Sequence, residues 1–149
     1  GITLKRELKN AKVTLVDISK KALNVARKNK KHLDIKLIKS NLFEKVNDKY
    51  DFIVSNPPYI ETTEIEKLDS SVKDFEPHIA LDGGKDGLDF YRKIAENSPT
   101  YLKENGQLFL EIGFEQAEKV SKLLEKNFTE IEIKKDYSNL DRFIFAKKR

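Results

Sequence analysis

The sequence contains no cysteine and no methionine, and it has only two histidines among 149 residues. Without cysteine, the chain can form no disulfide, offer no thiolate nucleophile and build no cysteine zinc site. The histidines, His32 and His78, are too few and too far apart to suggest a histidine metal cage, so no metal is expected. No apolar run approaches the ~20 residues of a membrane span, and no signal peptide is visible. We therefore expect a cytoplasmic protein.

Charged residues are abundant, but neither sign dominates. Lysine and arginine number 29 against 25 for aspartate and glutamate, which gives a net charge of +4. Basic residues gather at residues 28–31, 134–135 and 147–149, and we interpret them as solvated surface rather than as a nucleic-acid footprint. The length fits one folded domain, residues 1–149, with no membrane partner.

Two hydrophobic periods alternate along the chain and predict the order of its strands and helices. Short apolar runs predict strands at residues 13–17, 35–38, 50–55, 107–112, 130–135 and 142–147, the first of them buried. Helical spacing predicts helices at residues 2–8, after the cap Ser19, and at residues 88–102 and 114–126. Between them lies an irregular stretch, residues 60–85. This alternation predicts an α/β sheet with right-handed crossovers.

Polar side chains follow the first three predicted strands. Asp17, Asn41 and Asn56 stand at these three strand ends, so we expect them at one edge of one sheet, where α/β proteins bind ligands. Asp17 is either a turn residue before the Ser19 cap or a carboxylate that accepts the ribose hydroxyls of a nucleoside cofactor. Asn41, followed by Leu42, either caps its loop or meets the polar edge of an adenine beside apolar cover.

The motif Asn56-Pro57-Pro58-Tyr59 is the sharpest chemical signal. It could be a plain turn, because Asn and Pro are common turn formers. After a strand, however, the two prolines stiffen the backbone and can aim the Asn56 carboxamide oxygen and a carbonyl at one point. Two fixed acceptors match a planar NH2 group, which Tyr59 can cover. The three glycines at residues 83, 84 and 87 are open to a simpler interpretation as loop punctuation.

The order of these segments resembles the class I S-adenosylmethionine-dependent methyltransferases. Residues 13–17, 40–43 and 54–60 are similar to their second, third and fourth motifs. The Asn-Pro-Pro-Tyr signature also occurs in DNA amino and RNA guanine methyltransferases. Residues 74–77 and 80–91 are more specific, because they resemble the N(5)-glutamine methyltransferases of peptide chain release factors, the PrmC/HemK family. Residues 110–113 and 141–142 agree with this resemblance.

The resemblance implies a Rossmann-like sheet, mostly parallel, with an antiparallel C-terminal strand. It implies methyl transfer from S-adenosyl-L-methionine, leaving S-adenosyl-L-homocysteine, to the glutamine amide nitrogen in the Gly-Gly-Gln loop of a peptide chain release factor. Nucleic acid is not expected as the direct substrate. The implied site residues are Asn56, Pro57 and Tyr59 for catalysis, Asn56, Pro57, Pro58 and Tyr59 for the substrate, and Asp17, Asn41, Leu42 and Asn56 for the cofactor.

Two departures from the family pattern leave alternatives open. Family members commonly carry an acidic residue where this chain has Asn41. They also have a first strand and a glycine-rich loop before the helix that Gly1 begins here, so we expect Gly1 to follow a cut. Without that strand, its neighbours at residues 13–16 and 52–54 should expose a hydrophobic face, and the chain alone should bind cofactor weakly. The alternatives are an amino-group methyltransferase of DNA or RNA bases, and an inactive fragment without a complete cofactor site.

Overall fold

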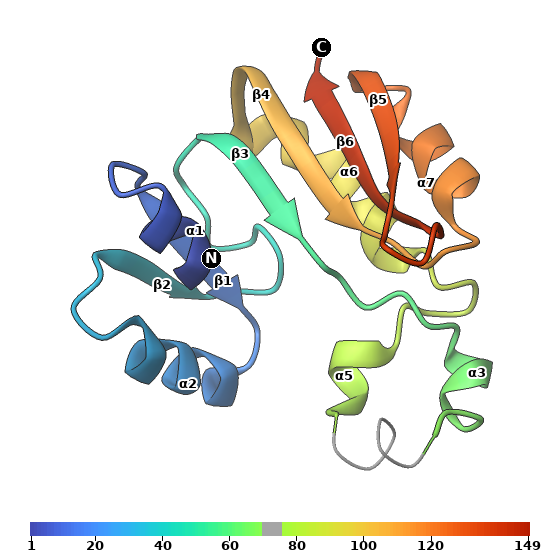
Figure 1. Ribbon diagram of the computed structural model, residues 1–149, viewed down its shortest axis with the longest axis horizontal. Helices are drawn as coiled ribbons and strands as arrows, with labels where there is room; N and C mark the ends of the chain where they lie inside the picture. The colour runs from blue at the N-terminus through green and yellow to red at the C-terminus, as the bar shows by residue number, and fades with distance from the viewer. Residues whose placement is uncertain (70–75) are drawn as a thin grey trace. The chain divides into compact units, whose positions relative to one another are not determined.

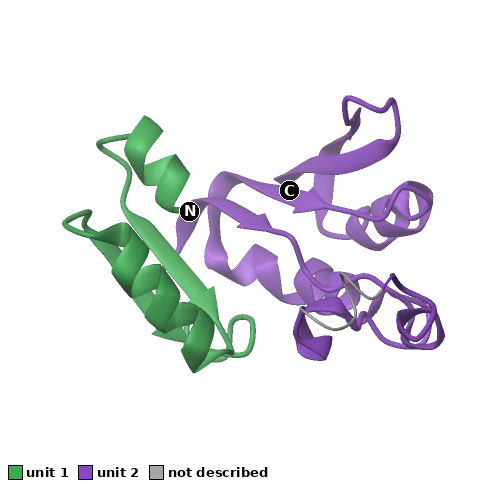
Figure 2. Ribbon diagram, turned by 60° about the horizontal axis from the view of Figure 1, so that its bottom comes forward, with its two compact units in different colours: residues 1–48 green, residues 49–149 purple. Residues whose placement is uncertain are grey.

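The computed structural model describes residues 1–69 and 76–149, so the predicted motif residues Asp74 and Phe75 lie outside the described residues. The chain divides into two compact units, residues 1–48 and residues 49–149 (Figure 2). The strands within the described ranges form two sheets, one of two strands and one of four. Within the described residues, no helix has the length and apolar character needed to cross a membrane.

The first unit contains a two-stranded parallel sheet, with one helix before the first strand and one helix between the strands. Its elements are α1 (Ile2–Glu7), β1 (Val13–Asp17), α2 (Lys20–Lys30) and β2 (Ile35–Lys39). Val13 lies opposite Ile35 in the register and Asp17 opposite Lys39, so β1 and β2 end at the same edge. Ser19 caps α2, as predicted, because its hydroxyl accepts a hydrogen bond from the Ala22 N–H at 3.2 Å.

The apolar run predicted that strand β1 is buried, and this prediction was wrong, whereas the exposed face expected for residues 13–16 is present. None of its residues is fully buried, and Val16 is 39% exposed. A strand is buried by the strands and helices around it, and among the described strands β1 pairs with β2 alone. The apolar run therefore predicts the strand but not its surroundings.

The second unit is built on the four-stranded sheet, in the order β3-β4-β6-β5 (Figure 1). Strands β3 and β4 are parallel, and β6 runs antiparallel to both β4 and β5. This arrangement confirms the mostly parallel sheet with an antiparallel C-terminal strand. The elements are β3 (Tyr50–Ser55), α3 (Thr62–Ile65), α5 (His78–Leu81), α6 (Asp89–Tyr101), β4 (Leu102–Glu111), α7 (Ala117–Leu124), β5 (Phe128–Lys135) and β6 (Asp141–Lys148).

Helices α6 and α7 cover one face of this sheet and form the core with it (Figure 1). The side chains of Tyr91 and Val120 from the helices and of Leu108 and Ile144 from the strands are fully buried. The edge strand β3 is different, because Phe52 and Val54 are each more than half exposed. The hydrophobic face expected for residues 52–54 is therefore present.

Three predicted segments differ from the structure by more than two residues. The stretch at residues 60–85 was predicted to be irregular, but it contains the short helices α3 and α5. Strand β4 begins at Leu102 rather than at residue 107, because a bulge opposite β3 takes up the predicted turn at Asn105, whose φ is 58°. Helix α7 is shorter than the predicted span of residues 114–126.

Candidate functional site

The Asn56-Pro57-Pro58-Tyr59 motif leaves the sheet at the carboxyl end of β3. Ser55, the last residue of β3, still pairs with Leu110 of β4, so the start of the motif is fixed by the sheet. Asn56 is exposed, whereas Pro57 is buried and Tyr59 is half-buried. Within the described part of this unit, neither the Asn56 carboxamide nor the Pro57 carbonyl takes part in a hydrogen bond. Both acceptors therefore have no hydrogen-bond partner among these residues.

The far end of the motif is fixed by the segment before α6. The Ile60 N–H donates to the Leu81 carbonyl at 3.1 Å, and the Gly83 N–H donates to the Ile60 carbonyl at 2.8 Å. A Cβ on Gly83 would lie 2.7 Å from the Tyr59 Cα, and a Cβ on Gly87 would lie 2.4 Å from the Tyr59 carbonyl oxygen. These glycines are therefore more than loop punctuation, since they let two backbone segments meet at Tyr59.

Gln116 joins the same junction from the sheet side. Its amide nitrogen donates to the Tyr59 carbonyl at 3.0 Å and to the Gly87 carbonyl at 3.3 Å. Its amide oxygen accepts from the Gly113 N–H at 3.1 Å. Sequence reasoning missed this residue. The one available signal was a glutamine at the start of a predicted helix, where Ser, Thr, Asp or Asn is preferred as the cap.

Two carboxylates hold the segment that packs on Tyr59. Asp82 Oδ1 accepts hydrogen bonds from the Thr62 hydroxyl at 2.7 Å and from the Gly84 N–H at 2.9 Å, and these bonds lower the pKa of Asp82. The Arg92 guanidinium, which hydrogen-bonds to Asp86, lowers the pKa of that carboxyl to about 2. Both groups are ionised at neutral pH and keep these bonds.

Tyr91 lies buried beside the motif and has a structural role. Its hydroxyl donates to the Glu111 carbonyl at 2.9 Å, and the side chain is fully inaccessible. Burial, followed by the nearby Tyr59 and Glu111, raises the pKa of Tyr91. The phenol therefore stays protonated and ties α6 to β4 rather than acting as a base.

In the first unit, Asp17 occupies the carboxyl end of β1. Its Oδ1 accepts the Ser19 N–H at 2.7 Å, and its backbone carbonyl accepts the Ser40 N–H at 3.1 Å. Asp17 thus serves as a turn residue before the α2 cap, which was one of its two interpretations. Its second oxygen, Oδ2, has no hydrogen bond within the described residues of this unit, so it can still accept one from a ligand.

Asn41 and Leu42 lie in the turn that follows β2. The Asn41 side-chain amide donates to Glu44 Oε1 at 2.7 Å, and the Asn41 backbone carbonyl accepts the Glu44 N–H, so Asn41 closes its own turn. Leu42 has a φ of 45°, in the left-handed region. Ser40, which the sequence interpretation did not single out, is buried and its hydroxyl accepts the Lys45 N–H at 2.9 Å.

The predicted residues are brought together only in part. Asp17 and the turn at residues 40–42 share one sheet edge, because β1 and β2 are parallel and in register. Asn56 follows β3, which belongs to the other sheet. The prediction of one edge of one sheet was therefore wrong.

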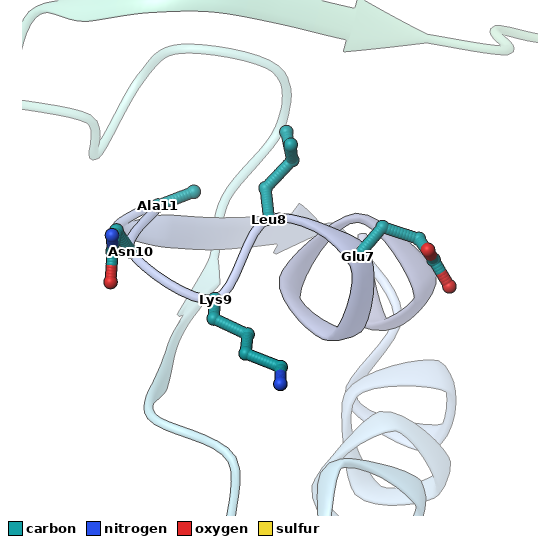
Figure 3. Close-up of a pocket in the computed structure, with 5 residues that line it drawn as sticks. All are labelled: Glu7, Leu8, Lys9, Asn10 and Ala11. Carbon is teal, nitrogen blue, oxygen red and sulfur yellow. The ribbon is translucent and has the colours of Figure 1, made fainter.

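A hollow of about 530 Å³ in the first unit is not a candidate ligand site. It is lined by Glu7, Leu8, Lys9, Asn10 and Ala11, a single continuous segment. Figure 3 shows the Leu8 and Lys9 side chains pointing in opposite directions, so polar groups do not converge there. The hollow lies at the start of β1 and Asp17 lies at its end, so roughly 13 Å of strand separates the hollow from Asp17.

Comparison with known proteins defines the class of the chain. The sequence profile of the family described as "Methyltransferase small domain" matches residues 1–72. The crystal structure of a methyltransferase from Pyrococcus furiosus matches with a TM-score of 0.71, covering 98% of this chain and 67% of that one at 15% identity. The chain therefore has the class I methyltransferase fold.

Curated relatives show which methyltransferases the chain resembles in sequence. The release factor glutamine methyltransferase of Fusobacterium nucleatum is 47% identical over 99% of this chain and 44% of its own length. That of Clostridium acetobutylicum is 42% identical over 98% of this chain and 54% of its own length. Over nearly its whole length the chain is thus similar in sequence to release factor glutamine methyltransferases, as the motifs predicted. It spans about half the length of the curated relatives it matches.

Proposed function

We propose that this chain carries the catalytic site of an S-adenosylmethionine-dependent methyltransferase that modifies a glutamine side-chain amide. The proposed substrate is the Gly-Gly-Gln loop of a peptide chain release factor. The names of the relatives support this substrate, and so does the motif resemblance. The main structural support is the pair of unoccupied acceptors, the Asn56 carboxamide oxygen and the Pro57 carbonyl, held between β3 and the anchored Tyr59.

The reacting amide nitrogen is a poor nucleophile, because its lone pair is delocalised into the carbonyl. S-adenosylmethionine, when bound, supplies the methyl group from its sulfonium. The sulfonium would leave as the neutral thioether of S-adenosylhomocysteine, and the proton lost by the methylated nitrogen would pass to solvent. Asn56 and Pro57 would accept the two substrate N–H groups and orient the nitrogen. Those hydrogen bonds strengthen as positive charge develops on the nitrogen, so they favour the transition state over the ground state.

The first unit would hold the nucleoside part of the cofactor. Asp17 fits ribose hydroxyls because Oδ2 has no partner among the described residues and Oδ1 keeps a second lone pair. Leu42 and Asn41 stand at the same sheet edge and would flank the adenine. Asn41 would contribute less than Asp17, since its amide is already bonded to Glu44.

Methylation of a nucleic-acid base is the competing function. A base methyltransferase needs a basic channel beside the Asn-Pro-Pro-Tyr motif. In residues 49–149 acidic side chains outnumber basic ones, and the side chain that hydrogen-bonds to the Tyr59 carbonyl is the neutral Gln116. These observations favour a protein substrate.

A direct comparison of substrates tests the proposal. The protein is incubated with labelled S-adenosylmethionine and either a release factor, an RNA or a DNA duplex. We expect label on the release factor alone. Labelled RNA or DNA, with an unlabelled release factor, would replace the proposed function with the competing one.

A further inference from the structure

Gln116 stands at the N-terminal end of α7, but its side chain does not cap that helix. It occupies the N-cap position, and no side-chain hydrogen bond to the helix is formed. Glutamine is a poor choice for a cap compared with Ser, Thr, Asp or Asn. The side chain turns back instead, to the junction around Tyr59. The contacts at this junction, rather than helix capping, explain why a glutamine stands at this position.

All polar groups of this carboxamide are engaged at the junction. The amide nitrogen uses both of its protons, one on the Tyr59 carbonyl and one on the Gly87 carbonyl, while the amide oxygen accepts the Gly113 N–H. The two carbonyls can only accept, and the Gly113 N–H can only donate. The chemistry of the partners therefore fixes which end of the amide faces which group.

The surrounding backbone fits closely around the amide. A Cβ on Gly87 would lie 2.7 Å from the Gln116 nitrogen, and a Cβ on Gly113 would lie 2.9 Å from its oxygen. Glycine at both positions leaves room for the glutamine and for no other heavy atom. One side chain thus connects three segments, namely the end of β4, the Asn-Pro-Pro-Tyr motif and the glycine loop before α6.

We infer that Gln116 is a positioning residue that sets the orientation of Tyr59 and, through it, the Asn56–Tyr59 loop. The loop is held at one end by the β3 ladder and at the other by Gln116, so its two open acceptors keep one geometry. Gln116 acts through Tyr59 and does not touch the reacting atoms. The catalytic part of this inference rests on the proposed function, whereas the positioning part stands on the hydrogen bonds alone.

The substitution Gln116→Glu removes the hydrogen bonds that the amide nitrogen donates while it keeps the size of the side chain. Glutamate has nearly the same shape and can still accept from Gly113, but it cannot donate to either carbonyl and brings a charge toward both. The matched control is Asn127→Asp. Asn127 is a half-buried carboxamide in the same unit that donates to the Ala95 carbonyl at 3.0 Å, far along the chain from the motif. A second variant, Gln116→Asn, keeps the amide but shortens its reach.

Hydrogen exchange measured by mass spectrometry on the 149-residue chain provides the first readout. In Gln116→Glu, peptides covering residues 56–62 and 82–89 should exchange about 10- to 30-fold faster, as expected for two lost neutral hydrogen bonds. Peptides from β5 and β6 should exchange as in the wild type. Asn127→Asp should leave residues 56–62 and 82–89 unchanged. Unchanged exchange in Gln116→Glu would overturn the inference.

Kinetics provide the second readout. Gln116→Glu should lower kcat for methyl transfer to a release factor at least tenfold, while the dissociation constant for S-adenosylmethionine stays within twofold of the wild type. Asn127→Asp should change neither quantity. Equal loss of cofactor affinity, or global unfolding of both Gln116 variants, would assign Gln116 to the fold and overturn the inference. A wild type without methyl transfer would refute the proposed function, and the exchange experiment would still decide the positioning role.

Discussion

A methyl group added at Gly87 should disrupt the junction that fixes Tyr59. Gly87 has a φ of 69°, and a Cβ there would lie 2.4 Å from the Tyr59 carbonyl oxygen and 2.7 Å from the Gln116 nitrogen. The left-handed conformation costs an L-residue ~1–2 kcal/mol. Overpacking against backbone atoms, which cannot rotate away, adds ~1–3 kcal/mol. We therefore expect Gly87→Ala to lower the free energy of unfolding by about 2–5 kcal/mol.

Gly84→Ala is the matched control. Gly84 also has a positive φ, 91°, but a Cβ there would meet the carboxylate of Asp89, which is the end of a flexible side chain. The carboxylate can rotate away, so Gly84→Ala should lower the free energy of unfolding only by the conformational cost of ~1–2 kcal/mol. The difference between the two variants isolates the contact with Tyr59.

Urea unfolding followed by tyrosine fluorescence measures this difference. The chain has no tryptophan, and all five tyrosines lie in residues 49–149, so the signal reports the unit that holds the motif. Under two-state conditions the midpoints convert to free energies when the m-values agree. If Gly87→Ala were no less stable than Gly84→Ala, the close packing of the glycine loop on Tyr59 would not be what fixes the motif.

Three further predictions concern chemistry and pH. Asn56→Ala should lower kcat about a hundredfold, with cofactor affinity unchanged by calorimetry, and equal loss of affinity would show that the residue is misassigned. Asp17→Ala should instead weaken cofactor binding before it affects saturated turnover, and an unchanged calorimetric affinity would remove it from the cofactor site. The pKa of Asp86 is lowered from 3.8 to about 2 in the folded state. The ionised carboxylate therefore contributes its whole stabilisation above pH 3.8, and this stabilisation is lost as the pH falls toward 2. Urea midpoints of Asp86→Asn should therefore fall less steeply over this pH range than those of the wild type, and parallel curves would contradict the assignment.

Local patterns predict most of the elements of this fold. Strand β3 has the predicted bounds, Tyr50–Ser55, because its apolar run is bounded by polar and proline residues. The Ser19 cap and the antiparallel β6 were also predicted correctly. Burial was harder to predict, since Val16 and Phe52 belong to apolar runs but lie on edge strands. Exposure depends on which strands pair, and a single run does not contain that information.

The candidate site was predictable only where its residues form a continuous motif. Asn56 to Tyr59 stand together in the sequence and after a recognisable strand. The contact between Gln116 and Tyr59 joins residues 57 positions apart, and no local period connects them. The close approach of Gly83 and Gly87 to Tyr59 is likewise a tertiary feature. A glycine in a sequence shows that a close approach is allowed, but not which segment approaches.

The most direct test of the proposed function is to locate the transferred methyl group. A release factor is incubated with the protein and S-adenosylmethionine, digested and analysed by mass spectrometry, alongside the same factor with the glutamine of its Gly-Gly-Gln loop replaced by glutamate. We predict the added mass of one methyl group on that glutamine amide in the first factor and none in the second. A methyl group on any other residue, or equal modification of both factors, would contradict the proposed substrate and the role of the Asn56 and Pro57 acceptors.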